Sequence, residues 1–193
     1  HIKEVGFELY QSMLEDAILE AKAKGSGLQV ASDSFSPQIT VDAPILIPEN
    51  YVPDLSLRMG LYRRMNGLKT RQEIESFAAE MIDRFGLLPE QVKTLFRVTA
   101  LKLRCEPLGI TKVDVGAEHG RIEFGAQTEI DPMVLVRMIQ DNPQRYRLEG
   151  ATMFRFNAPM AGVELRLNTV EALIDRLAQA PQDTPVKGKG KRP

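Results

Sequence analysis

Hydrophobic residues recur at helical spacing in the middle of the chain, and capping residues mark where each helix begins and ends. One stripe sits at the three- and four-residue spacing of a single helical face; it consists of Ile74, Phe77, Ala78, Met81, Ile82 and Phe85. Thr70 and Glu73 stand in the capping-box arrangement that starts a helix. Gly86 suits the left-handed residue that ends it, and Pro89 suits the first turn of the next helix. The pattern predicts a rigid corner between two helices.

A helix is predicted on each side of this one. Asp54 follows Pro53 and should cap the first, whose inward residues are Leu55, Met59, Tyr62 and Met65. The second should run from Pro89 to about Glu106, with Val92, Leu95, Phe96, Thr99 and Leu103 inward. Three consecutive helices joined by tight turns predict a compact helical layer.

Alternating apolar and polar residues predict strands on both sides of the helices. Ile39 and Val41, leading into residues 45–47, indicate a strand before Pro48, and residues 111–115 and 121–124 flank a hairpin turn. Three more short strands are expected around Tyr146 and Leu148, around Met153, Phe154 and Phe156, and around Val163 and Leu165. A short helix capped by Asp131 and a closing helix from Thr169 to Ala178 complete the pattern. It predicts an α+β fold, a helical layer on a small, mostly antiparallel sheet.

The two ends differ from this middle region. Residues 1–24 predict a long amphipathic helix, because Val5, Leu9, Met13, Ala17 and Ala21 fall four apart. This helix either folds back so that its apolar side packs on the core of the domain, or packs that side on a surface outside the domain. Residues 25–37 read as a linker, 38–180 as the folded domain, and 181–193 as a disordered basic tail.

Composition limits the partners and the compartment that can be expected for this protein. The 193 residues include 25 basic and 26 acidic side chains, so the net charge of -1 creates no overall attraction to nucleic acid or to an acidic membrane. The single cysteine cannot form an intrachain disulfide, and no apolar run is long enough to cross a bilayer. The N-terminal residues do not resemble a signal peptide. We expect a cytoplasmic protein with no membrane partner.

Residues suited to catalysis are sparse. His119 falls in the predicted hairpin turn, where a solvated role is expected, and His1 is the only other histidine. Cys105 reads as a small, half-buried hydrophobe. Gly188 and Lys189 lack the following serine or threonine of a phosphate loop. We expect no catalytic, cofactor or metal site in this chain.

Charged side chains could form two kinds of binding surface. The alternative for each is an ordinary surface that contacts only solvent. Glu80, Asp83 and Arg84 should point away from the apolar stripe of their helix, toward solvent or a partner. Basic residues that could contact nucleic acid lie on the preceding helix and in the tail; they are Arg58, Arg63, Arg64, Lys187, Lys189, Lys191 and Arg192.

Several motifs along the chain resemble one family. They are His1-Ile2 with Gly6-Phe7 and Leu9-Tyr10, the stretch from Ile47 to Asp54, Arg58, Leu61-Tyr62, the stretch from Ile82 to Pro89, and Tyr146 to Gly150. Together they are similar to the C-terminal region of the bacterial transcription-repair coupling factor (Mfd) family. The likeness runs from His1 to about Ala180 and does not cover the tail.

This resemblance implies a parent protein that is an ATP-dependent DNA translocase. Such proteins displace stalled RNA polymerase from damaged DNA and recruit UvrA for nucleotide excision repair. ATP and magnesium would belong to the parent motor, of which this chain carries none. Residues 1–24 would be the hook-like helix at the end of the motor domain.

The resemblance also implies an autoinhibitory role for the C-terminal domain. In the family this domain docks on a UvrB-like N-terminal module of the same protein and hides the surface that UvrA binds. Glu80, Asp83 and Arg84 stand at the matching positions. The expected function is therefore a non-catalytic regulatory domain, and the alternative is a nucleic-acid-contacting module that uses the basic residues.

Overall fold

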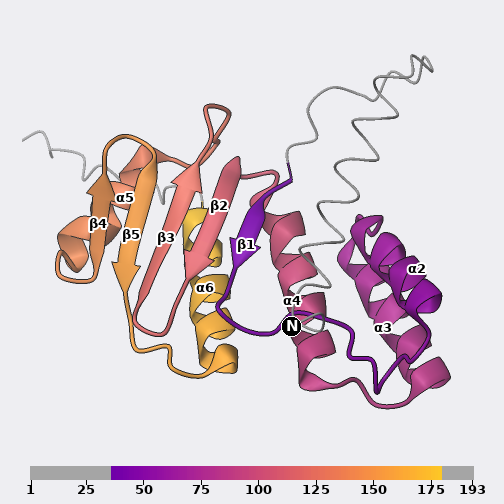
Figure 1. Ribbon diagram of the computed structural model, residues 1–193. Helices are drawn as coiled ribbons and strands as arrows, with labels where there is room; N and C mark the ends of the chain where they lie inside the picture. The colour runs from indigo at the N-terminus through magenta and orange to yellow at the C-terminus, as the bar shows by residue number, and fades with distance from the viewer. Residues whose placement is uncertain (1–35, 180–193) are drawn as a thin grey trace, which may run out of the picture.

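A five-stranded sheet and the helices α2 to α6 make up residues 36–179, the part of the chain that the computed structural model describes (Figure 1). The predicted helix at 1–24, most of the linker at 25–37 and the basic tail at 181–193 lie outside the described residues.

The three predicted central helices are confirmed as α2 (Leu55–Asn66), α3 (Arg71–Phe85) and α4 (Glu90–Cys105). Asp54 caps α2, its Oδ1 accepting the N–H of Leu57 at 2.7 Å. The capping box of α3 is complete, since Thr70 Oγ1 accepts the N–H of Glu73 at 3.1 Å and Glu73 Oε2 accepts the N–H of Thr70 at 3.2 Å. Local capping chemistry therefore fixes where α2 and α3 begin.

The sheet has the order β1-β2-β3-β5-β4. Its strands are β1 (Gln38–Thr40), β2 (Ile110–Val115), β3 (His119–Phe124), β4 (Tyr146–Glu149) and β5 (Met153–Asn157). β1 is parallel to β2, and all the other pairs are antiparallel. With α5 (Pro132–Asp141) and α6 (Val163–Leu177), this arrangement confirms the predicted α+β class.

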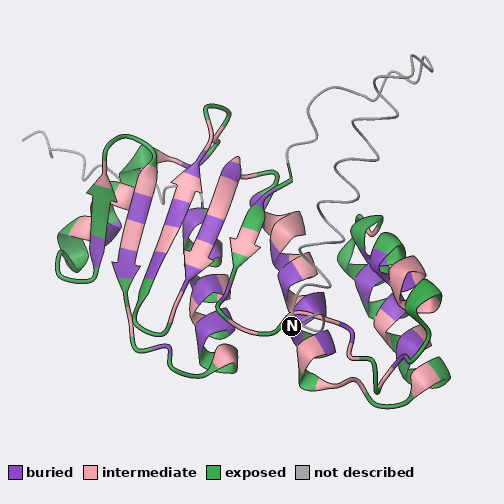
Figure 2. Cartoon of the chain, viewed as in Figure 1, coloured by how far each residue is buried: buried purple, intermediate pink, exposed green. Residues whose placement is uncertain are grey.

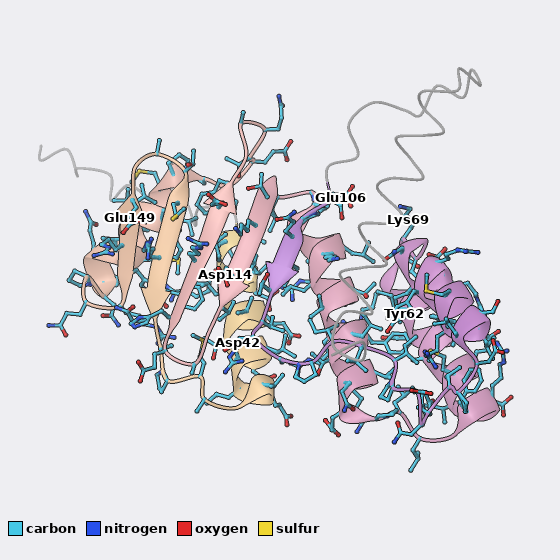
Figure 3. The ribbon with its side chains drawn as sticks, viewed as in Figure 1. Asp42, Tyr62, Lys69, Glu106, Asp114 and Glu149 are labelled. Carbon is cyan, nitrogen blue, oxygen red and sulfur yellow. The ribbon has the colours of Figure 1, made fainter. Side chains whose placement is uncertain are left out.

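Two strand predictions differ from the structure. Val163 and Leu165, expected in a strand, form the first turn of α6, and Leu165 is 51% exposed. The strand expected before Pro48 ends at Thr40, because the chain turns at Asp42, whose φ is 49° (labelled in Figure 3). Ile47 then donates its N–H to the Tyr62 hydroxyl at 2.7 Å rather than to a strand.

The helix α4 contributes to two separate hydrophobic cores. Val92, Leu95 and Phe96 pack with α2 and α3, whereas Leu101 and Cys105 pack with the sheet and with α5 and α6. Accordingly, α2 and α3 lie beside α4 on the side away from the sheet (Figure 1), and buried positions run along most of α4 (Figure 2). The predicted helical layer thus meets the sheet through α4.

Two residues assigned to the inward faces are exposed instead. Leu55 is 64% exposed because it lies in the first turn of α2, and Ile82 is 42% exposed because it stands at the edge of the α3 stripe. Ile74, Phe77 and Met81 are buried as predicted.

A buried arginine ties α6 to the segment that follows β1. The side chain of Arg166, only 4% exposed, donates to the carbonyl oxygens of Val41 at 2.6 Å, Asp42 at 2.9 Å, Met160 at 3.2 Å and Ala161 at 3.3 Å. Four carbonyl partners satisfy a buried guanidinium whose desolvation would otherwise be costly.

Replacing Arg166 with Met should destabilise the domain by about 2 to 4 kcal/mol, because several buried carbonyl oxygens lose their donors. The measurement is urea unfolding of the chain followed by circular dichroism. Arg137→Met, at an exposed position of α5, is the matched control and should change the unfolding free energy by less than about 0.5 kcal/mol. Equal effects of the two substitutions would show that the carbonyl contacts of Arg166 contribute nothing to stability.

Candidate docking surface

The corner between α3 and α4 is held by Tyr51, which precedes α2. Its hydroxyl donates to the carbonyl oxygen of Gly86 at 2.8 Å and contacts that of Met81 at 3.3 Å, and its ring meets Phe85 edge-on at 5.9 Å. The Tyr51 hydroxyl is protonated at neutral pH, and burial raises its pKa further. Gly86 has a φ of 91°, which a residue with a side chain rarely adopts. Tyr51 therefore holds the end of α3, and Gly86 allows the backbone turn that follows it.

Glu80 is paired within the chain. Its carboxylate forms an ion pair with Arg64 of α2, and the Arg64 guanidinium also lies 4.4 Å from the centre of the Phe77 ring. The sequence assigned Glu80 to a docking face and Arg64 to a nucleic-acid face, and the structure brings the two together at the α2–α3 seam. Neither charge is free to meet a partner unless this pair opens.

Asp83 presents the free charge of this region. It is exposed and forms no ion pair or hydrogen bond with any residue the structure describes. Ile82 is 42% exposed beside it, and Leu87, just after the helix, is 86% exposed. Arg84 lies with its guanidinium 4.9 Å from the centre of the Phe85 ring. We call Ile82, Asp83, Arg84 and Leu87 the α3 corner surface.

Leu87 was not singled out from the sequence, because an apolar residue between Gly86 and Pro89 reads as core. Its position could have indicated that Leu87 is exposed. It lies in the short connection between α3 and α4, so it is not part of a helical face that packs on the core.

The basic residues of α2 do not form one face. Arg58 Nη1 donates to the carbonyl oxygens of Val52 at 2.7 Å and Pro53 at 3.0 Å, so it holds the segment before the helix. Arg64 is paired with Glu80, and only Arg63 of the three is exposed without such a contact in residues 36–179. The four tail residues, Lys187, Lys189, Lys191 and Arg192, lie outside the described residues.

Two residues that the sequence analysis weighed for catalysis, His119 and Cys105, lie in the described residues. His119 Nδ1 lies 2.7 Å from Asn157 Oδ1 at the end of the hairpin. Cys105 is buried in the sheet-side core, and burial raises its thiol pKa to about 12, so the reactive thiolate is disfavoured at neutral pH. Over residues 36–179, no group of three or more His, Cys, Asp or Glu could hold a metal ion, and no helix is long and apolar enough to cross a membrane.

Comparison with known proteins identifies the family. A protein-family model, the TRCF domain, matches residues 41–135, which include α2, α3, α4 and the α3 corner surface. The transcription-repair-coupling factor of Haemophilus influenzae is 33% identical over 180 residues, 92% of this chain, and that of Rickettsia conorii is 41% identical over 134 residues, 69% of this chain. The chain belongs to the TRCF domain family.

A solved structure supports the fold of this TRCF domain. The C-terminal domain of a transcription-repair coupling factor superposes with a TM-score of 0.59 at 17% identity, covering 74% of this chain and 94% of that one. The chain spans only 15% of the Haemophilus influenzae relative and 12% of the Rickettsia conorii one. The predicted family and the predicted fold class are both confirmed.

Removing Arg64 and Glu80 separately and together should reveal a coupling free energy of about 0.2 to 1 kcal/mol, since both side chains are about half exposed. The measurement is a double-mutant cycle of urea unfolding with Arg64→Gln and Glu80→Gln. The ion pair of Arg71 and Glu75, 88% and 66% exposed, provides a control cycle that should give nearly zero coupling. If the Arg64–Glu80 cycle also gave none, the two charges would be independent in solution and both available to partners.

Proposed function

We propose that this TRCF domain is a non-catalytic docking domain of a larger transcription-repair coupling factor, and that the α3 corner surface makes the contact. The observation that carries the proposal is the unpaired carboxylate of Asp83 at a helical corner that also carries two exposed apolar side chains, Ile82 and Leu87. Relatives that bear the name transcription-repair-coupling factor, and the short share of their length that the chain matches, support a role inside a larger protein.

The partner that best fits is the UvrB-like module of the same protein. Docking there would mask the surface that binds UvrA, so the domain would act by autoinhibition until it is released. The parent would be the ATP-dependent translocase, with ATP and magnesium in its motor, that displaces RNA polymerase from DNA in the cytoplasm. This chain would bring no cofactor of its own.

The chemistry of the corner suits a reversible contact. A carboxylate on a fixed helix can accept charge-assisted hydrogen bonds from an arginine of the partner. If the exposed side chains of Leu87 and Ile82 pack on the partner at the same corner, they exclude water from the contact, which strengthens the electrostatic attraction. Because Gly86 and Tyr51 hold the corner in place, docking would cost little conformational entropy in this domain.

Glu80 takes a different part in this proposal from Asp83. Its carboxylate forms an ion pair with Arg64, and this pair links α3 to α2 in the free domain. It would meet the partner only if an arginine of the partner replaced Arg64. We therefore assign the principal contact to Asp83, with Arg84 and Glu80 at its border.

Nucleic-acid binding, the alternative function, has weaker support. Arg58 donates hydrogen bonds to backbone carbonyl oxygens, and Arg64 forms an ion pair with Glu80. Of the three arginines of α2, only Arg63 is therefore left to contact a phosphate in the described residues. A single exposed arginine does not provide the several phosphate contacts on which non-specific affinity depends. That function would rest on the tail.

Replacing Asp83 with Ala should weaken binding of the chain to the purified UvrB-like module by at least about 30-fold, roughly 2 kcal/mol, because the partner's cation is left unpaired. The melting temperature should stay the same, since Asp83 is exposed and its loss removes no core volume. Isothermal titration calorimetry measures the affinity.

Glu118→Ala, an exposed carboxylate in the turn between β2 and β3, is the matched control and should bind as the unaltered chain does. Equal affinities of the Asp83 and Glu118 variants, both folded, would mean that the α3 corner surface is merely solvated. Tight duplex DNA binding by the 193-residue chain would instead favour the nucleic-acid alternative, and a chain lacking residues 181–193 would show whether the tail is responsible.

A further inference from the structure

A pocket of about 390 Å³ opens between the start of the edge strand β4 and α6. Both polar and apolar side chains line it; six of its lining residues are Arg145, Tyr146, Phe156, Asn168, Leu173 and Arg176. Tyr146, Phe156 and Leu173 belong to the sheet-side core. The pocket therefore lies on a different core from the α3 corner surface, which is built on the α2–α3–α4 side.

Two arginines converge on one aromatic ring at this pocket. The guanidinium carbons of Arg145 and Arg176 lie 5.4 Å and 5.9 Å from the centre of the Tyr146 ring. Arg176 Nη1 also makes a long contact of 3.5 Å with the Tyr146 hydroxyl. The ring attracts each cation, but the two cations repel each other.

No carboxylate neutralises these arginines in the described residues. The acidic residues of α6 that are nearest in sequence to Arg176 form ion pairs with arginines of α4. Glu171 pairs with Arg97 at 3.0 Å, and Asp175 pairs with Arg104. Neither Arg145 nor Arg176 forms an ion pair within residues 36–179. The two arginines that line the pocket are thus both without an ion pair in the described residues.

We propose that this pocket binds an acidic side chain of a protein segment. A carboxylate between the two guanidiniums would accept hydrogen bonds from both and remove their repulsion. The only charged side chains that line the pocket in the described residues are these two arginines, so its charge complements a carboxylate.

The surroundings favour a peptide over nucleic acid. Tyr146 is only 6% exposed, so its ring offers no face on which a base could stack. The pocket is lined by only two cations, Arg145 and Arg176, fewer than the several phosphate contacts on which nucleic-acid affinity depends. One carboxylate fits this charge arrangement better than a polyanion does.

Titration of the 193-residue chain with a capped tripeptide, glutamate between two leucines, tests the proposal by amide chemical shifts. The peptide should shift resonances of residues 145–146, 156 and 168–176, and the same peptide with glutamine should bind at least about tenfold more weakly, because it lacks the charge. The double variant Arg145→Gln, Arg176→Gln should lose about as much for the glutamate peptide. Arg137→Gln, at an exposed arginine of α5, should bind as the unaltered chain does.

Equal binding of the glutamate and glutamine peptides, or shifts confined to other residues, would overturn the proposal. It would also be overturned if a single-stranded oligonucleotide shifted the pocket resonances at lower concentration than the glutamate peptide did. The resonances of the unaltered residues in the double variant report whether it is folded, so a loss of binding there is not mistaken for unfolding. Binding at the α3 corner surface is measured separately and does not affect this outcome.

Discussion

The packing of α4 against two cores is the constraint on which the rest of the structure depends. One part of this helix buries Val92 and Leu95 under α2 and α3, and its last turns bury Leu101 and Cys105 under the sheet. Between them, Val98 packs with Val41 and Leu167, so the segment after β1 and α6 meet α4 at its middle. Arg97 adds a two-pronged contact to Glu171 of α6, at 3.1 and 3.0 Å. A helix buried on more than one side in this way orients the two halves of the domain relative to each other.

This arrangement places the two proposed binding surfaces on separate parts of the domain. The α3 corner surface is carried by α3 and its junction with α4, and Tyr51 fixes it through Gly86. The pocket at Tyr146 is carried by β4 and α6. Some charges are paired, as in Arg64 with Glu80 and Arg104 with Asp175. Asp83 at the corner and the two arginines at the pocket form no ion pair within residues 36–179.

Features that depend on neighbouring residues could be predicted from the sequence, and features that depend on distant residues could not. The caps at Asp54 and Thr70 were predicted because each acts within three residues. The start of α6 was missed because Val163 and Leu165 alternate like a strand over so short a stretch. The pairing of Arg64 with Glu80 joins two helices, and the contact of Arg166 with Val41 spans 125 residues. A pattern of neighbouring residues in the sequence does not predict such contacts.

Native-state hydrogen exchange on a Leu101→Ala variant tests most directly whether α4 couples the two halves. Leu101 is 1% exposed and packs only in the sheet-side core, so its truncation should cost about 2 to 5 kcal/mol there. If α4 joins the halves into one cooperative unit, amides of α3 and of β3 should lose protection by similar free energies. Leu55→Ala, at an exposed leucine, serves as the control. Loss of protection in β3 while α3 keeps its original exchange rates would contradict the account.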